Sequence, residues 1–530
     1  MVALIGRVLC LLSLLSFFVS PSVAIPGIHE LNPREEARHP CQVVHLCAAK
    51  RAVSKFFSKR SDTAIPSVSN ARRGPDLIEK DVVVIGGGAG GTFTAVSLLN
   101  KGKNVLLIEK EDHLGGHTDS YVDPATGLAG ETGVEGFCNI TVVRKFFDTL
   151  NVAYRYQSLI WDKVVYHDFD TGEPVKYPFN PDHETERRKY MEVLGRYPYL
   201  FNGYEDLPDP IPAELLMPFG IFAEQNGIKG VIIDMIFATL GFSDILQQPT
   251  LYILKAYFSQ AVMSMNNGFV VSKDGGNLQL YRTAQELLNK NQGRTGSSLL
   301  LSSTVTSVRR TAAGVQMTVR TPSGLVKVKA KKLVVAMPPQ LHTLAGFDLD
   351  RSEIAVFRQL RPGGGGPRDL TGGAIANALM RNTNLTANTN YLNVSPVNKA
   401  NLPDLPATAY IHATKISGIY SVKYVYGADE NNKGSFTDEE VKVNMVKDII
   451  KLQEPGSQEP EPEIIRFSRH SPMFLGVETE KIRRGFYKEM VALQGYRHTY
   501  YTGAAFVTHY SSLIWHYTDT VVVPKVLSAL

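Results

Sequence analysis

The most regular hydrophobic pattern in this chain lies in its first quarter. Four consecutive apolar residues at 82–85 are typical of a strand buried on both faces, and glycines follow them directly. Apolar residues then recur at helical spacing at Phe93, Val96 and Leu99. A second apolar run at 105–108 reads as another buried strand. The sequence therefore predicts a strand–helix–strand unit of the kind that builds parallel sheets.

Other segments predict further elements with the same two periodicities. Leu278, Tyr281, Ala284 and Leu288 recur at helical spacing after two glycines and an asparagine. Strands are expected at 304–308, 315–320 and 325–330 as a meander, then at 333–337 and 416–426, and a closing helix is expected at 511–527.

Three glycines occupy the turn between the first strand and its helix. Gly86, Gly88 and Gly91 have the spacing of a dinucleotide-binding turn. The first permits the tight turn, the second lets backbone amides approach a pyrophosphate, and the third lets the helix pack closely. Glu109 lies about twenty residues beyond these glycines. An acid at that spacing accepts a hydrogen bond from a ribose hydroxyl. The alternative is a glycine-rich turn of another α/β unit, but the complete set favours dinucleotide binding.

The chain just beyond this acid resembles the flavin amine oxidase superfamily. Residues 109–118 include Lys110 and the run Gly115-Gly116-His117, which is similar to the second glycine motif of that superfamily. The resemblance implies that this loop runs beside the diphosphate and ribityl chain of FAD, with Lys110 and His117 at the same site. FAD is therefore the expected cofactor.

Two later segments carry the same resemblance. In such enzymes a valine placed like Val305 offers its backbone to the adenine. Residues 500–505, which contain Gly503 and Ala504, are similar to the last strand and the turn that contacts the flavin. Ala504 stands where many members have a glutamate, which disfavours simple amine oxidation.

The motifs together resemble the β-cyclopiazonate dehydrogenase family of fungal flavoenzymes. Its characteristic residues are the Leu-Gly-Gly-His run followed by residues 123–127, and residues 502–505 and 511–515 near the C-terminus. The resemblance covers most of residues 80–530. It implies an α/β fold, in which a Rossmann-type FAD-binding domain of the two-dinucleotide-binding-domain class carries an inserted α+β substrate domain, as in amine oxidases.

This resemblance also implies a discontinuous division of the chain. The FAD-binding domain is expected at 79–150, 270–345 and 485–530, and the substrate domain at 151–269 and 346–484.

The N-terminus has the pattern of a secretory signal. Arg7 precedes an apolar run at 8–19 and small residues at 22–24, so residues 1–24 are expected to be removed, with an uncleaved anchor as the alternative. Residues 25–78 show no periodicity and read as a leader or arm. Because no segment is long and apolar enough to span a bilayer, no stable membrane span is expected, and the protein should be secreted or lumenal.

Glycosylation and disulfide sites fit this route. Asn139, Asn384 and Asn393 each begin an Asn-x-Ser/Thr sequon and are expected to carry glycans. Cys41 and Cys47 are close enough in sequence to form a disulfide in an oxidising compartment, with two free thiols as the alternative.

Charge and motif content disfavour several other classes of protein. The net charge of +5 is spread along the 530 residues without a basic stripe, so a nucleic-acid partner is not expected. The 13 histidines lack metal-binding spacing, and there is no hydrolase elbow or phosphate loop. No metal is therefore expected.

The expected function is FAD-dependent dehydrogenation or oxidative cyclisation of an apolar small molecule. In such chemistry flavin N5 accepts a hydride, and oxygen or another acceptor reoxidises the flavin. Relatives in the resembled family belong to fungal secondary metabolism, in pathways to indole alkaloids and diterpenoid pyrones. The alternatives are an isomerase of polyunsaturated fatty acids, an amine oxidase and, with least support, a non-catalytic scaffold for prenylated proteins.

The catalytic residues are less well defined. His117 is placed to hydrogen-bond the flavin or to carry it covalently. His509, Trp515 and His516 follow the predicted flavin turn, and Lys423 lies on a predicted strand of the substrate half. Each of them also fits a purely structural role.

Overall fold

A computed structural model describes most of the chain beyond the predicted leader. The described residues are 77–158, 163–176, 183–236, 238–242, 244–291, 297–363, 373–427, 436–453 and 461–530. The predicted signal peptide and Cys41–Cys47 pair lie outside them, as does the predicted leader apart from residues 77–78, which begin a strand.

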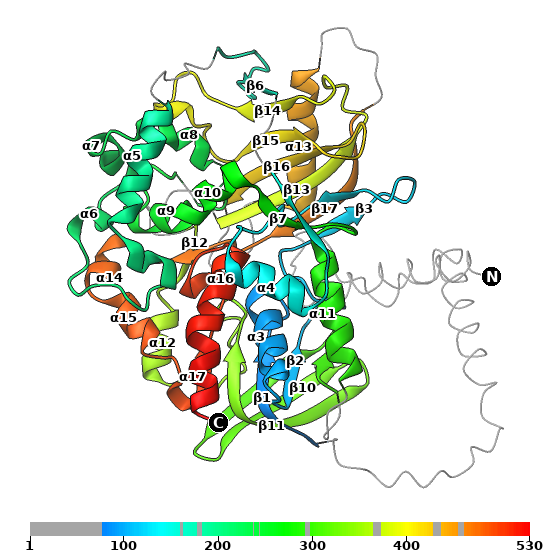
Figure 1. The fold of residues 1–530 in the computed structure, drawn as a ribbon, viewed down its shortest axis with the longest axis vertical. Coiled ribbons are helices and arrows are strands. Elements are labelled where there is room, and N and C mark those ends of the chain that lie inside the picture. The colour runs from blue at the N-terminus through cyan, green and yellow to red at the C-terminus, as the bar shows by residue number, and fades with distance from the viewer. Residues whose placement is uncertain are drawn as a thin grey trace, which may run out of the picture. The chain divides into compact units, whose positions relative to one another are not determined.

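A seven-stranded mixed sheet contains the predicted dinucleotide unit (Figure 1). In spatial order its strands are β8 (Leu299–Leu300), β2 (Val105–Ile108), β1 (Leu77–Ile85), β11 (Gly324–Val335), β10 (Gly314–Thr321) and β9 (Thr304–Thr311), and β19 (Thr499–Tyr501) pairs with β11. β1, β2, β8, β11 and β19 are parallel, whereas β9, β10 and β11 form an antiparallel meander. The parallel strands are apolar along their length because elements cover both faces of such a sheet.

β11 joins the two parts of this sheet. Its first half pairs with β10 and its last three residues pair with β19, while β1 follows both halves on the other side. The prediction of two strands separated near residue 331 is therefore wrong, since continuous pairing with β1 holds the backbone extended.

A second sheet of six strands forms the core of the inserted part of the chain. Its order is β17 (Glu463–His470), β13 (Gly373–Arg381), β16 (Tyr420–Gly427), β15 (Ala407–Ala413), β14 (Asn390–Asn393) and β6 (Val164–His167). Helix α13 (Asp438–Leu452) packs Val441, Met445 and Ile449 on one face of this sheet. The other face carries polar side chains, including Asn377, Lys423 and Arg466, that contact the segment at 119–135.

Helices and two short hairpins complete the described structure. Near the nucleotide sheet lie α3 (Ala89–Asn100), α4 (Thr141–Thr149), α11 (Leu278–Lys290), α12 (Arg351–Phe357), α14 (Thr479–Arg483), α15 (Phe486–Val491), α16 (Ser511–Tyr517) and α17 (Val523–Ser528). The inserted part adds α5 (His183–Gly195), α6 (Ala213–Leu216), α7 (Phe219–Gln225), α8 (Ile232–Met235), α9 (Thr250–Ala256) and α10 (Ser259–Asn267). The hairpins pair β3 (Ser120–Val122) with β4 (Ala129–Glu131), and β5 (Tyr154–Gln157) with β7 (Phe269–Ser272).

The predicted closing helix contains a local irregularity. A π-helical segment, Thr518–Val522, separates α16 from α17. The helix at Leu278 begins where the sequence predicts it.

Candidate flavin site

The two glycine motifs lie against each other at the carboxyl ends of β1 and β2. The turn begins at Gly86, which has a φ of 102°, and a Cβ on Gly91 would lie 1.7 Å from the Gly86 carbonyl oxygen. A Cβ on Gly116 would lie 2.8 Å from the Cα of Gly88. Because Gly88 caps α3 without a side-chain hydrogen bond, the first amides of this helix are available to a phosphate.

The acid predicted to bind ribose lies at this turn. The Glu109 carboxylate accepts hydrogen bonds from the amides of Gly87 and Glu111, the latter at 2.9 Å. The Ser303 amide donates to the Glu109 carbonyl at 2.8 Å, which places the start of β9 and therefore Val305 nearby. Lys110 lies only at the edge of the site.

The ammonium group of Lys110 points to solvent. It pairs with Glu111 at 3.0 Å, and its side chain is 75% exposed. A contribution of Lys110 to cofactor binding would therefore come from its backbone.

The C-terminal turn converges on the same edge of the sheet. The Thr502 amide donates to the Val335 carbonyl at 3.0 Å, and a Cβ on Gly90 would lie 2.8 Å from the Thr502 methyl group. Gly503 has a φ of 112°, and Ala504 begins one 3₁₀ turn. Four parallel strands, β1, β2, β11 and β19, thus end at one edge of the sheet, which is where open α/β sheets bind nucleotides.

His117 directly follows the second glycine motif. Its side chain is exposed, although many protein atoms surround the ring. Burial, with added repulsion from His470, His509 and Lys110, lowers the pKa of His117 to about 3. His117 is therefore neutral at physiological pH.

Two further histidines belong to this interior region. The His470 ring lies 5.1 Å from that of His117, and its Nε2 lies 2.6 Å from the Thr132 carbonyl oxygen. Burial lowers the pKa of His470 to about 4 and that of His509 to about 4. All three imidazoles are thus neutral hydrogen-bonding groups.

Polar side chains on the six-stranded sheet meet the segment at 119–135. Arg466 pairs with Asp119 at 2.8 Å. The Asn377 amide donates to the Glu131 carbonyl at 3.2 Å. These contacts join the inserted sheet to the loop that follows the second glycine motif.

The most polar part of this interface is the cluster of Glu135, His412 and Lys423. The Glu135 carboxylate lies 3.0 Å from His412 Nε2 and 2.9 Å from Lys423 Nζ. The three side chains are 19%, 15% and 5% exposed, respectively. Burial raises the pKa of Glu135, but Lys423 and His412 outweigh it and hold that pKa well below its usual range. Glu135 is therefore ionised and fixes both partners.

Sequence reasoning found Lys423 but missed Glu135, His412 and His470. None of these residues belongs to a motif, and they are far apart in the chain. Polar residues at alternating positions of otherwise apolar strands are the signal that could have indicated them.

The structure places Trp515 in the core, which is the structural role that the sequence also allowed for it. The indole is fully buried, lies 4.8 Å from the Phe137 ring, and donates to the Ala89 carbonyl at 3.0 Å. This contact turns it toward α3. His516 instead lies 4.4 Å from the Phe201 ring.

The three sequons differ in accessibility. Asn393 is buried in β14, where its side chain donates to the Thr408 carbonyl at 2.8 Å and accepts from the Phe169 amide at 3.1 Å. The prediction of a glycan on Asn393 is therefore wrong for the folded protein. Asn384 is exposed, and Asn139 is half-buried.

The described residues contain no group of three or more histidine, cysteine, aspartate or glutamate side chains suited to hold a metal ion. None of their helices is both long and apolar enough to cross a membrane.

The fold and the two adjoining glycine motifs are those of an FAD-binding protein of the two-dinucleotide-binding-domain class. The family described as NAD(P)-binding Rossmann-like domain matches residues 84–150. The chain is 36% identical over 466 residues to the FAD-dependent oxidoreductase oblC of Cochliobolus heterostrophus, covering 86% of this chain and 92% of the relative. It is 31% identical over 465 residues to the β-cyclopiazonate dehydrogenase of Aspergillus flavus, covering 87% and 96%.

Solved structures support the fold. A fatty acid isomerase from P. acnes has a TM-score of 0.65 at 17% identity, covering 84% of this chain and 98% of that one. Cyclohexylamine oxidase from Brevibacterium oxydans has a TM-score of 0.58 at 13% identity, covering 85% and 99%. The chain belongs to the family of fungal FAD-dependent oxidoreductases that includes β-cyclopiazonate dehydrogenase, which confirms the predicted fold class and the predicted cofactor.

Proposed function

We propose that this protein oxidises an apolar small molecule of fungal secondary metabolism, by dehydrogenation or oxidative cyclisation. The observation that carries the proposal is the Glu135–His412–Lys423 cluster, which joins the inserted sheet to the segment beyond the second glycine motif, near the three neutral histidines. The name of β-cyclopiazonate dehydrogenase supports this chemistry. An indole alkaloid or a diterpenoid pyrone is the proposed substrate type.

The cleft residues suit the parts of FAD. The α3 amides at Gly88 and the Gly116 backbone would hold the diphosphate, Glu109 the ribose, and the Val305 backbone the adenine. Bound FAD supplies a hydride acceptor, and the protein supplies orientation and exclusion of water. Gly503 lets the last turn approach the same cleft.

A largely apolar cavity in the inserted part supports an apolar substrate. It has a volume of about 500 Å³, and ten of its sixteen lining residues are apolar, including Leu240, Phe242 and Leu405; the others include Asp244, Lys399 and Asp404. The Phe242 ring lies 5.7 Å from the His509 imidazole, so one side chain separates this cavity from the histidine region. The substrate would enter from this cavity.

The polar cluster is suited to accept the proton that a substrate heteroatom loses on oxidation. Glu135 fixes His412 Nε2 and Lys423 Nζ at hydrogen-bonding distance, so donors and acceptors hold one orientation. The clustered charges also orient a polar group of an otherwise apolar molecule.

Covalent attachment of FAD through His117 is a further part of the proposal. A neutral imidazole is the nucleophilic form, and His117 is neutral beside the second glycine motif. Acid precipitation should leave the flavin with the wild-type protein and release it from H117A. H113A is the matched control, because His113 lies in the same loop and pairs with Asp112. Complete release from wild type would contradict covalent attachment.

The function itself is tested with the purified protein under anaerobic conditions. A flavin spectrum should bleach on mixing with true substrate and recover when oxygen or another acceptor is added. Candidate metabolites of both proposed types would be screened. A flavin that is oxidised at the end of anaerobic turnover would instead indicate the isomerase alternative, and a folded protein that binds no FAD would refute the proposal.

A further inference from the structure

The half-buried Glu131 carboxyl group lies between the Glu135–His412–Lys423 cluster and the surface. Glu131 Oε2 accepts from the Ser120 hydroxyl at 2.6 Å, and its Oε1 accepts from the Asn277 amide at 2.9 Å. The Ser120 oxygen in turn accepts from the Leu278 amide at 3.1 Å. Both carboxyl oxygens are therefore held in place by hydrogen bonds.

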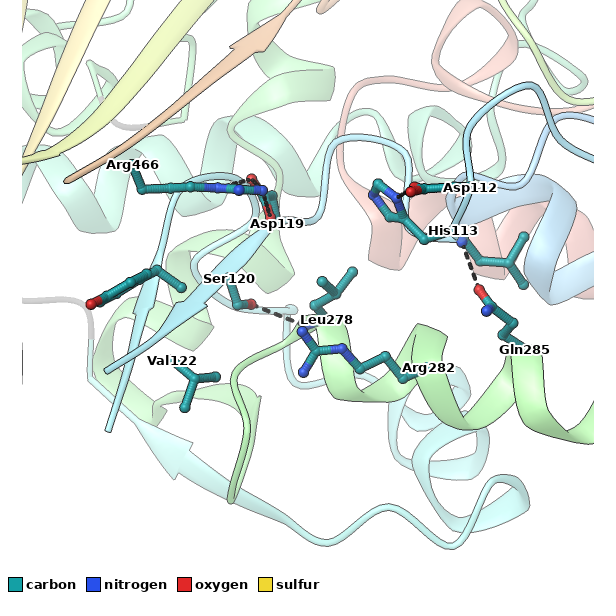
Figure 2. A pocket seen from close by; sticks show the side chains of 11 residues that line it. Asp112, His113, Asp119, Ser120, Val122, Leu278, Arg282, Gln285 and Arg466 are labelled. Atoms are coloured by element: carbon teal, nitrogen blue, oxygen red, sulfur yellow. Dashed lines mark hydrogen bonds and ion pairs between the residues drawn. The ribbon is translucent and has the colours of Figure 1, made fainter. Parts of the chain in front are cut away.

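Ser120 lies at the surface end of this hydrogen-bonded series of side chains. It lines a polar cavity of about 460 Å³ between β3, α11 and β17 (Figure 2). Arg282 and Arg466 line the same cavity and are exposed, so the cavity reaches solvent. The Ser120 hydroxyl thus connects Glu131 to an aqueous space.

The Glu135–Lys423 pair lies at the interior end of this series of polar groups. Glu131 precedes Glu135 by four residues on the same segment, and the charges of Glu135 and Lys423 both act on its carboxyl group. Asn377 binds the Glu131 carbonyl and lies opposite Lys423 in the β13–β16 register. Glu131 is therefore fixed beside the cluster to which the substrate proton is assigned.

Glu131 differs from Glu135 in its charge environment. Lys423 and Lys415 act on Glu131 from a distance, and within the described residues no cation is in ion-pair contact with it. Burial is the largest influence and raises the pKa of Glu131 to about 7, with Glu135 adding to the increase. A group that exchanges its proton near neutral pH is suited to pass one on.

We propose that the proton released during substrate oxidation leaves the interior through Glu131 and Ser120 into the polar cavity of Figure 2. This route rests on the proposed function. Oxidation of an H–C–X–H group, where X is nitrogen or oxygen, forms C=X, transfers a hydride to the flavin and releases the proton of X. The Glu131 carboxylate takes that proton. The Ser120 hydroxyl, which donates to the ionised carboxylate, then turns to accept the proton from the protonated acid and gives its own hydroxyl proton to water in the polar cavity.

The route is tested by the exchange of the Glu131 proton in the holoenzyme. The C=O stretch of a buried carboxylic acid shifts on deuteration, so infrared spectra after rapid mixing with D₂O give the exchange rate. The band that is lost in E131Q identifies the group, and E286Q is the matched control because Glu286 is exposed on α11. We expect S120A to slow exchange at least tenfold.

A second variant tests the same route without touching these hydrogen bonds. V122W introduces a large side chain into the wall of the polar cavity and should also slow exchange at least tenfold. Unchanged exchange in the folded variants, or the absence of an acid band assigned to Glu131, would overturn the route. A yellow, FAD-binding enzyme with exchange independent of Ser120 contradicts the route alone, whereas Ser120-dependent exchange in a protein that binds no FAD contradicts the proposed function alone.

Discussion

Replacement of Glu135 by glutamine removes one charge and almost no volume from the polar cluster. Removing one partner of a buried ion pair costs about 3–5 kcal/mol, because the other charge remains buried. Lys423 is 5% exposed and would lose its carboxylate at 2.9 Å, whereas Glu135 is itself 19% exposed. We therefore expect E135Q to lower the free energy of unfolding by about 3 kcal/mol, at the lower end of that range.

The sign of the pH dependence follows from the depressed pKa of Glu135. Its contribution to stability is complete above the unfolded pKa of about 4.3 and is lost as the pH falls through the folded pKa. The difference between wild type and E135Q should therefore be full at pH 7 and shrink below about pH 4.3. Urea unfolding of the FAD-saturated proteins at several pH values measures both quantities.

A double-mutant cycle separates the ion pair from general damage. E135Q/K423M removes both charges, so it should be less destabilised than the sum of the single variants by at least about 1 kcal/mol. Additive effects at pH 7 would refute the assignment of the cluster as a coupled pair.

Three further predictions concern the cofactor, the core and the sequons. G116A should weaken FAD binding at least tenfold in fluorescence titration, because the added Cβ lies 2.8 Å from Gly88 Cα; G195A, with open space around it, should not. W515A should lower the free energy of unfolding by about 3–5 kcal/mol while leaving the spectrum of bound flavin unchanged, since the indole is fully buried. If the protein enters the secretory route, N384Q should remove a mobility shift that glycosidase treatment also removes, whereas N393Q should not, because Asn393 is buried.

The dinucleotide unit could be predicted because its information is local. A strand, a glycine turn, a helix, a second strand and an acid follow one another within residues 82–109, and each element has a distinct pattern. The glycine spacing is recognisable in the sequence because sterics require glycine at these positions. A Cβ on Gly91, for example, would overlap the Gly86 carbonyl. The class of cofactor followed from these residues.

The polar cluster could not be predicted because its members meet only in the folded protein. Glu135 follows a hairpin, whereas His412 and Lys423 lie on strands that are distant in the sequence. Trp515 shows a different limit. Helical spacing indicates which residues share a face, but the packing of neighbouring helices decides whether that face meets the flavin or the core.

β11 pairs with β10 along its first half and with β19 at its end, and this change of strand partner affects how the protein folds during synthesis. β19 is synthesised only after the second stretch of the inserted domain, yet it completes the pairing of β11 and brings Thr502 against Gly90. A nascent chain on the ribosome thus carries an open strand edge at the cofactor half until the other half has emerged. Maturation of the flavin cleft should therefore be post-translational, and chaperones that shield unpaired strands would raise the yield of holoenzyme.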